Sequence, residues 1–290
     1  MLYRQYDQKG LDGQYNMRER VPSFPDFVAR WAAQSAPVRA QPDARLDLSY
    51  GGNPRERLDL FSCGQDGAPL HVFIHGGYWQ AMDKEHFAYV ANGLLPHGFD
   101  VAVIEYALAP EVTVGEIVRQ CRAAVAWLWR HASDHGFDRD RITISGHSAG
   151  GHLTATLLLS DWSEFASDLP MNMLKGGLAI SGLYDLEPIR LSYLNAALGL
   201  QADDAQALSP IHLVHQAAAA PPLLVAVGGD ETDEFQRQQA DFLEQWTSRG
   251  LPGEAVAMPG TNHFSVVDGM GEPASALVSA IRRLSDGTVV

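Results

Sequence analysis

Residues 142–153 read Ile-Thr-Ile-Ser-Gly-His-Ser-Ala-Gly-Gly-His-Leu. A G-x-S-x-G motif, from Gly146 to Gly150, follows a short apolar run rich in β-branched residues and precedes a run that is compatible with a helix. A serine at such a strand-to-helix turn takes a strained backbone conformation and needs glycine neighbours. We therefore predict that Ser148 is a nucleophile whose hydroxyl lies at the edge of a sheet.

Strand and helix patterns alternate along the rest of the chain. Residues 45–50 and 57–61 alternate polar with apolar side chains, as antiparallel edge strands do. Repeated strand–helix alternation predicts a mainly parallel sheet with helices on both faces, and with the motif it indicates the α/β-hydrolase fold. The buried strands are expected at 70–74, 101–104, 142–145, 176–181, 223–227 and 254–258, and the main helices at 114–129, 235–246 and 274–284.

The N-terminal segment, residues 1–43, differs from the rest because it is polar and contains four prolines. Phe24, Phe27, Val28 and Trp31 recur there at helical spacing and predict one short amphipathic helix. We expect residues 44–290 to form a single domain. Residues 184–220 lack a regular pattern and are expected to form a small cap, and the N-terminal segment is in a position to cover the active site.

Composition restricts the kind of protein. The chain has 290 residues, of which 46% are hydrophobic, and a formal net charge of −14. Such an acidic balance disfavours binding to nucleic acid or to an anionic membrane surface. The sequence shows no signal-peptide core, no membrane-spanning run, no metal-binding motif and only two cysteines. We expect a cytoplasmic protein with a small-molecule substrate and no cofactor or metal; a homodimer stays open.

A serine hydroxyl needs a base that takes its proton and an acid that orients the base. His263 lies in the loop after the last expected strand, where this fold delivers its histidine. The acid should follow the strand 223–227, where Asp230 and Glu231 are adjacent. Asp230 is nearer the strand end, and Glu231 has the longer side chain, so that spacing alone leaves both open.

Negative charge on the reacting carbonyl oxygen requires fixed N–H donors. The sequence His75-Gly76-Gly77-Tyr78-Trp79 directly follows the expected strand 70–74. Glycines there let the backbone approach a substrate closely. We therefore expect an oxyanion hole formed by the amides of Gly76, Gly77 and Ala149, the last being the residue after the nucleophile.

Five stretches together resemble the serine-hydrolase kynurenine formamidases, from about residue 70 to the C-terminus. They are HGGYW at 75–79, GHSAGGHL at 146–153, SGLYDLEPI at 181–189, EFQRQ at 234–238 and NHF at 262–264. HGG and G-x-S-x-G are shared with hormone-sensitive-lipase-like esterases. Matching without gaps on the strand and EFQRQ places the family's acid on Glu231, which we prefer, whereas matching on the esterases' acid gives Asp230. The resemblance implies an aspartate at this position in the animal formamidases, so the glutamate of this chain departs from the family's pattern.

The resemblance implies hydrolysis of an aryl formamide, N-formyl-kynurenine to kynurenine and formate, through an acyl-enzyme and without a metal. Tyr78 and Trp79 would narrow the acyl side, and aromatic rings would face the leaving group. The expected pocket residues are Tyr78, Trp79, His147, Tyr184, Tyr193 and Phe264. Two alternatives are a carboxylesterase for short acyl or aryl esters and a non-catalytic ligand-binding protein on the same scaffold; the presence of His263 disfavours the second.

Overall fold

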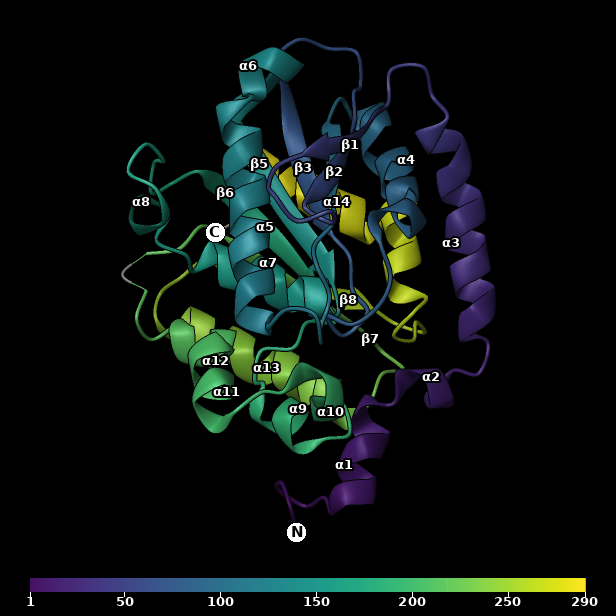
Figure 1. Cartoon of the computed structure of the whole chain (residues 1–290), viewed down its shortest axis with the longest axis vertical. Helices are drawn as coiled ribbons and strands as arrows, with labels where there is room; N and C mark the ends of the chain where they lie inside the picture. Colours follow the sequence, from purple (N-terminus) through teal and green to yellow (C-terminus); the bar gives the residue numbers. More distant parts are fainter. Residues whose placement is uncertain (218, 290) are drawn as a thin grey trace.

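The computed structural model describes residues 1–217 and 219–289, and its centre is an eight-stranded sheet in the order β1-β2-β4-β3-β5-β6-β7-β8 (Figure 1). The pairs β1–β2 and β2–β4 are antiparallel, and the pairings from β4 to β8 are parallel. The predicted α/β-hydrolase fold is confirmed. The strands are β1 (Arg45–Ser49), β2 (Arg57–Phe61), β3 (Ala68–Ile74), β4 (Asp100–Ile104), β5 (Phe137–His147), β6 (Leu174–Ile180), β7 (Leu223–Gly228) and β8 (Gly253–Met258).

Strands β3 and β5 form the middle of the sheet, and β3 is buried along its whole length. Side-chain hydrogen bonds join these two strands in addition to the backbone pairing. His71 on β3 is fully buried, and its two ring nitrogens lie 2.9 Å from Thr143 Oγ1 and 2.7 Å from Ser145 Oγ on β5. Burial lowers the pKa of His71 to about 3, because a charged imidazole would lose its hydration there. The ring is therefore a neutral, structural part of the core.

Helices cover both faces of the sheet (Figure 1). Helices α5 (Val114–Arg130), α7 (Ala149–Leu158) and α13 (Asp233–Ser248) lie on one face, and α4 (Ala91–Leu94) and α14 (Ala276–Ser285) on the other. The three main predicted helices correspond to α5, α13 and α14. Short helical turns complete the layers: η1 (Lys84–His86), η2 (Ala88–Val90), η3 (Leu95–His97), α6 (Ala132–His135), α8 (Trp162–Phe165) and η4 (Val266–Gly271).

The N-terminal segment is more helical than its sequence predicts. It forms three helices, α1 (Gln8–Tyr15), α2 (Met17–Arg20) and α3 (Phe24–Arg39), instead of one short helix. The proline positions explain the length of α3: Pro25 lies in the first turn, where no backbone N–H is needed, and Pro37 lies close to the end. In Figure 1 α3 runs along one side of the molecule and α1 lies below the short helices α9 and α10.

Residues 184–220, between β6 and β7, form four short helices. These are α9 (Glu187–Leu191), α10 (Asn195–Leu198), α11 (Ala202–Leu208) and α12 (Pro210–Leu213). They lie against α13, α7 and α1. Leu194 and Leu198 are buried, so this region has its own apolar contacts with the body of the protein.

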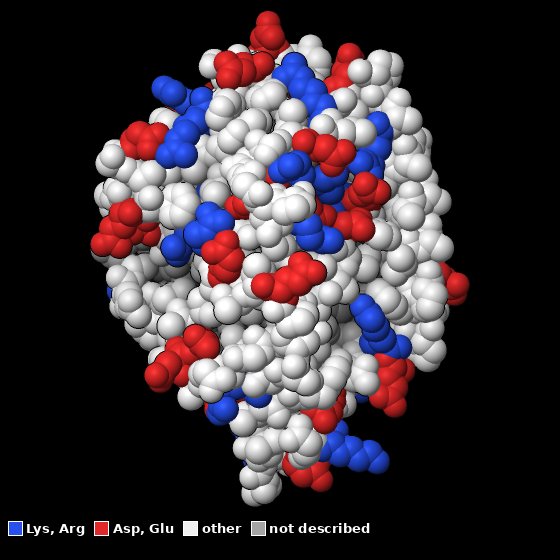
Figure 2. All heavy atoms as spheres, viewed as in Figure 1, with Lys and Arg blue, Asp and Glu red and all other residues white. Residues whose placement is uncertain are grey.

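Charges on the face shown in Figure 2 lie in small mixed groups of acidic and basic side chains. The ion pair between Arg119 and Glu56, at 2.9 Å, joins a half-exposed arginine to a buried carboxylate. Within residues 1–217 and 219–289, no helix is long and apolar enough to cross a membrane. In the same residues, no three His, Cys, Asp or Glu side chains are grouped in a way that could hold a metal ion.

Candidate active site

Ser148 occupies a sharp turn between β5 and α7. Its backbone has φ 58° and ψ −116°, a conformation that non-glycine residues rarely adopt. A Cβ atom added at Gly146 would lie 2.2 Å from the carbonyl oxygen of Gly150, and one added at Gly150 would lie 2.0 Å from that of Ile74. Larger residues would collide there, so the glycines of the motif are what allow the turn to form.

Three loops at the carboxyl edge of the sheet bring together a hydroxyl, an imidazole and a carboxylate. Ser148 Oγ lies 3.1 Å from His263 Nε2, and His263 Nδ1 lies 2.6 Å from Glu231 Oε2. All three residues are buried. This geometry allows the imidazole to take the serine proton while the carboxylate stabilises the resulting imidazolium.

The structure separates the two acids that spacing left open. Glu231 faces His263, and its other oxygen accepts hydrogen bonds from the Gly228 amide at 2.8 Å and from Ser181 Oγ at 2.5 Å. Asp230 has an exposed side chain, and its backbone amide donates to the carbonyl of Thr261. Only the glutamate therefore contacts the imidazole.

Ser181 was not singled out from the sequence. It lies directly after β6 and has a positive φ of 49°. Its hydroxyl fixes one oxygen of Glu231, which leaves the other oxygen aimed at His263. A serine after a strand carries no specific signal, so only the three-dimensional arrangement identifies it as a positioning residue.

The glycine loop after β3 lies against the turn that carries Ser148. A Cβ atom at Gly76 would approach Ser148 Cβ to 3.0 Å, and Gly77 has a φ of 105°, which favours glycine. Within the described residues, the amides of Gly76, Gly77 and Ala149 have no hydrogen-bond acceptor. Free N–H groups beside a nucleophile are what an oxyanion hole requires.

His75 and Glu105 hold this glycine loop in place. The His75 ring stacks on Tyr106 with 4.2 Å between centroids, and its nitrogens lie 2.8 Å from the Gly76 carbonyl oxygen and 3.1 Å from Glu105 Oε1. The same carboxylate oxygen accepts a hydrogen bond from Arg55 at 2.7 Å. Burial acts to raise the pKa of Glu105, but His75 and Arg55 hold it below its ordinary value. The charged Glu105 carboxylate thus supports the glycine loop from below.

His147 lines the site without reaching the serine hydroxyl. Burial, and secondarily the nearby His263, lower the pKa of His147 well below its ordinary value, so the ring is neutral. Its Nε2–H donates to the backbone carbonyl of His263 at 2.7 Å. His147 therefore helps to place the main chain that carries the imidazole.

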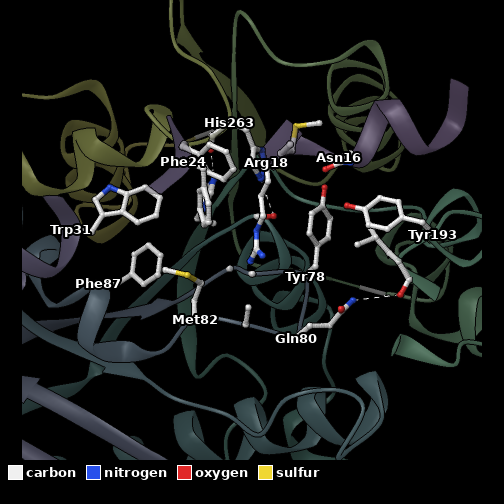
Figure 3. Close-up of a pocket in the computed structure, with 18 residues that line it drawn as sticks. Asn16, Arg18, Phe24, Trp31, Tyr78, Gln80, Met82, Phe87, Tyr193 and His263 are labelled. Atoms are coloured by element: carbon white, nitrogen blue, oxygen red, sulfur yellow. Dashed lines mark hydrogen bonds between the residues drawn. The ribbon is translucent and has the colours of Figure 1, made fainter. Parts of the chain in front are cut away.

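A cavity of about 320 Å³ opens over Ser148 and is walled largely by aromatic rings (Figure 3). Its volume lies in the range of small-molecule sites. Figure 3 shows Trp31 and Phe87 at one end and Tyr193 at the other. Four of the predicted pocket residues line it: Tyr78, His147, Tyr193 and Phe264.

Trp79 and Tyr184 do not line this cavity, and their prediction as pocket residues is wrong. Both side chains are fully buried. In the tight turn after the glycines, Tyr78 faces the cavity and Trp79 faces the core, where its ring lies edge-on to His152 at 5.1 Å. The Tyr184 ring stacks on Phe242 at 4.3 Å. Large rings gain more from burial than from exposure at a rim, and these two complete the core.

Five N-terminal residues line the cavity and were not identified from the sequence. They are Asn16, Met17, Arg18, Phe24 and Trp31. Phe24 packs on Phe264, the neighbour of His263, with 4.6 Å between ring centroids. No local pattern reveals these contacts, because they depend on how the segment packs against loops that lie 45 residues or more further along the chain.

Tyr15 fastens the N-terminal segment to the loops of the site. Its hydroxyl lies 3.0 Å from Glu234 Oε2 and accepts from Gln238 Nε2 at 2.9 Å, and its carbonyl accepts from the Tyr78 hydroxyl at 2.7 Å. Burial, with help from Glu234, raises the pKa of Tyr15 well above its ordinary value, so it stays a donor. The EFQRQ stretch thus has a physical role: its first and last residues hold Tyr15.

Comparisons with known proteins agree with this architecture. The BD-FAE family model matches residues 58–247. The kynurenine formamidase of Danio rerio is 30% identical over 80% of this chain and 78% of its own, and that of Salmo salar is 32% identical over 77% and 76%. A crystal structure from Silicibacter sp. TM1040, of a protein assigned provisionally as a thioesterase, is 34% identical with a TM-score of 0.82, covering 94% of this chain and 98% of its own.

These similarities span most of the chain, and they include the strands and loops that carry the serine, the acid and the glycine turn. The TM-score of 0.82 shows that the Silicibacter protein shares the fold built on the eight-stranded sheet. The chain therefore belongs to the BD-FAE family of α/β-hydrolases and is a serine hydrolase similar to the kynurenine formamidases.

Proposed function

We propose that Ser148, His263 and Glu231 form a catalytic triad that cleaves a small acyl amide of an aromatic compound, with N-formyl-kynurenine as the substrate. The observation that carries this proposal is the continuous contact from Ser148 Oγ through His263 to Glu231, at 3.1 and 2.6 Å, beneath an aromatic cavity. The products are kynurenine and formate. The similarity to the kynurenine formamidases of the two fishes supports this choice of substrate.

In the first half of the reaction, His263 Nε2 takes the Ser148 proton as the oxygen attacks the formyl carbon. The carbonyl oxygen becomes an oxyanion, which accepts hydrogen bonds from the amides of Gly76, Gly77 and Ala149. When the carbon–nitrogen bond breaks, His263 gives the proton to the leaving arylamine. A formyl ester remains on Ser148.

In the second half, water takes the place of the amine. His263 removes a proton from the water, which attacks the formyl ester through a second oxyanion in the same hole. The bond to Ser148 breaks, the serine oxygen recovers its proton from His263, and formate leaves. Throughout both halves Glu231 stays ionised and stabilises the imidazolium.

The surroundings of the serine favour a small acyl group on an aromatic leaving group. The glycine loop is close to Ser148, since a Cβ at Gly76 would approach its Cβ to 3.0 Å. Aromatic rings wall the cavity beyond it, among them Phe24, Trp31 and Phe264. Stacked and edge-on contacts of such rings favour a planar aromatic group.

The N-terminal segment, residues 1–43, and the region 184–220 act in this proposal as a cap on the single hydrolase domain of residues 44–290. Met17 and Leu194 approach the cavity from these two regions. Gln8 Nε2 donates to the Leu191 carbonyl at 3.1 Å, so the two regions also contact each other. A cap of this kind limits the access of bulk water to the site and orients the leaving group.

The test is a comparison of kcat/KM for N-formyl-kynurenine and p-nitrophenyl acetate on the same enzyme preparation. We expect the formamide to be preferred by about 10-fold or more, because the aromatic walls contribute binding energy beyond the acyl group. Ser148→Ala enzyme purified in parallel measures contaminating activity. A clear preference for the ester, or no turnover of the formamide, would overturn the proposal in favour of a carboxylesterase.

A further inference from the structure

The cavity over Ser148 carries a single formal charge among its lining residues, and that charge is positive. Arg18 is the one Lys, Arg, Asp or Glu side chain among the described residues that line it. In a chain with a formal net charge of −14, a pocket without a carboxylate is unlike the rest of the surface. The one formal charge among the lining residues is therefore opposite in sign to the net charge of the molecule.

Within the described residues, the Arg18 guanidinium also has no hydrogen-bond or ion-pair partner. Within residues 1–217 and 219–289, no carboxylate lies within 4.0 Å of its guanidinium, whereas Arg30 on the neighbouring helix α3 pairs with Asp268 at 2.5 Å. Arg18 is exposed. A guanidinium has five N–H donors in a fork that matches a carboxylate, and here all of them are available to a ligand.

The Phe24 ring stacks on the guanidinium of Arg18. Its central carbon lies 4.9 Å from the centroid of the Phe24 ring, and Phe24 in turn packs on Phe264, the neighbour of His263. In Figure 3 the Arg18 side chain extends between Phe24 and Tyr78. Stacking on a ring restricts a guanidinium to one plane and lowers the entropy that binding costs.

Nearby polar groups already have partners. The Tyr78 hydroxyl donates to the carbonyl of Tyr15 at 2.7 Å, and Asn16 Nδ2 donates to Glu19 Oε2 at 2.8 Å. Among the described residues that line the cavity, Arg18 is thus the one that offers a ligand both a formal charge and several N–H donors. Its position beyond the aromatic wall suits a group on the leaving part of the substrate.

We propose that Arg18 binds a carboxylate on the leaving group, so that the enzyme selects aryl formamides or esters that carry a carboxylate over those that lack one. This inference rests on the proposed function. It adds that the substrate carries a carboxylate and that Arg18 recognises this group. Arg18 touches the substrate away from the scissile bond and acts on specificity. The permanent charge of arginine makes this selection independent of pH.

The direct test uses two substrates of similar size that differ only in the α-carboxyl group, N-formyl-kynurenine and its α-carboxamide analogue. In Arg18→Gln, the ratio of kcat/KM for the acid to that for the carboxamide should fall by about 10- to 100-fold, mostly through KM, since a hydrogen bond to a charged group is lost. Arg18→Lys should restore part of the ratio. Arg20→Gln, an exposed arginine on the same helix outside the cavity lining, is the matched control and should leave the ratio unchanged.

A second arm separates this inference from the proposed function. Kynurenine and its decarboxylated analogue are compared as inhibitors of p-nitrophenyl acetate hydrolysis, which requires no formamidase activity. We expect the carboxylate form to bind at least about 10-fold more tightly to the wild type, and the difference to vanish in Arg18→Gln. Equal inhibition in the wild type, or an equal loss in Arg20→Gln, would overturn the role of Arg18 even if the formamide is a good substrate. Failure of formamide turnover with the inhibition difference intact would overturn the substrate alone.

Discussion

Ser148→Ala is expected to lower kcat by about 10⁴- to 10⁶-fold while the protein stays folded. Without the hydroxyl no acyl-enzyme forms, and the oxyanion donors and the cavity can contribute only the residual catalysis of a binding site. The side chain makes one protein hydrogen bond, to His263 at 3.1 Å, and its removal leaves the glycine packing of the turn in place. Steady-state turnover of N-formyl-kynurenine and p-nitrophenyl acetate measures the loss of kcat. Thermal unfolding, followed in parallel, shows whether the variant stays folded.

The matched control is Ser163→Ala, an exposed serine that lies on α8, outside the cavity lining. It should retain wild-type kcat and the same unfolding temperature. Activity in Ser148→Ala within about 10-fold of the wild type would mean that the nucleophile has been misassigned.

Glu231→Gln is expected to lower kcat by about 10³- to 10⁴-fold with little change in KM. The amide retains the size of the carboxylate, but it removes the negative charge that stabilises the imidazolium. It also places an N–H donor where His263 Nδ1 now faces Glu231 Oε2 at 2.6 Å, which favours the wrong tautomer. Rates of p-nitrophenyl acetate hydrolysis across pH measure the loss.

Asp230→Asn is the matched control for this carboxylate. Its side chain is exposed and adjacent in sequence, so that the same chemical change there should alter kcat by less than about threefold. A larger loss in Asp230→Asn than in Glu231→Gln would show that the other acid orients the imidazole in the working enzyme.

The fold could be predicted from the sequence because its signals are local. Strands β3, β4 and β5 appear as short apolar runs, and the glycines around Ser148 appear as a motif because the turn tolerates few other residues. A sharp loop after a buried strand also fixes which edge of the sheet a residue reaches. The positions of Ser148, His263 and the glycine loop follow from this rule alone.

The choice between the acids depended on contacts that spacing does not encode. Asp230 is nearer the strand end, but its amide is tied to the Thr261 carbonyl and its side chain is exposed. Glu231, one residue later, reaches His263 and is fixed by Ser181 from a different loop. One residue of register in a turn reverses the direction of a side chain, so a linear distance could not decide.

The pocket was the least predictable part. Nearness in sequence to a catalytic position suggested Trp79, yet its ring is fully buried and only its neighbour Tyr78 lines the cavity. Arg18 and Phe24 belong to a segment in which one short helix was predicted and three are found. Pocket walls are formed by segments distant in the chain, and their contacts depend on packing rather than on periodicity.

Covalent labelling shows which hydroxyl His263 and Glu231 activate, and we expect it to be that of Ser148. The enzyme is treated with a p-nitrophenyl alkylphosphonate, which phosphonylates an activated serine with loss of p-nitrophenolate; it is then digested and mapped by mass spectrometry while activity is followed. We predict one adduct per chain, on Ser148, that forms in step with inactivation and is absent from Ser148→Ala. Inactivation with the adduct on another residue, or full loss of activity with Ser148 unmodified, would contradict it.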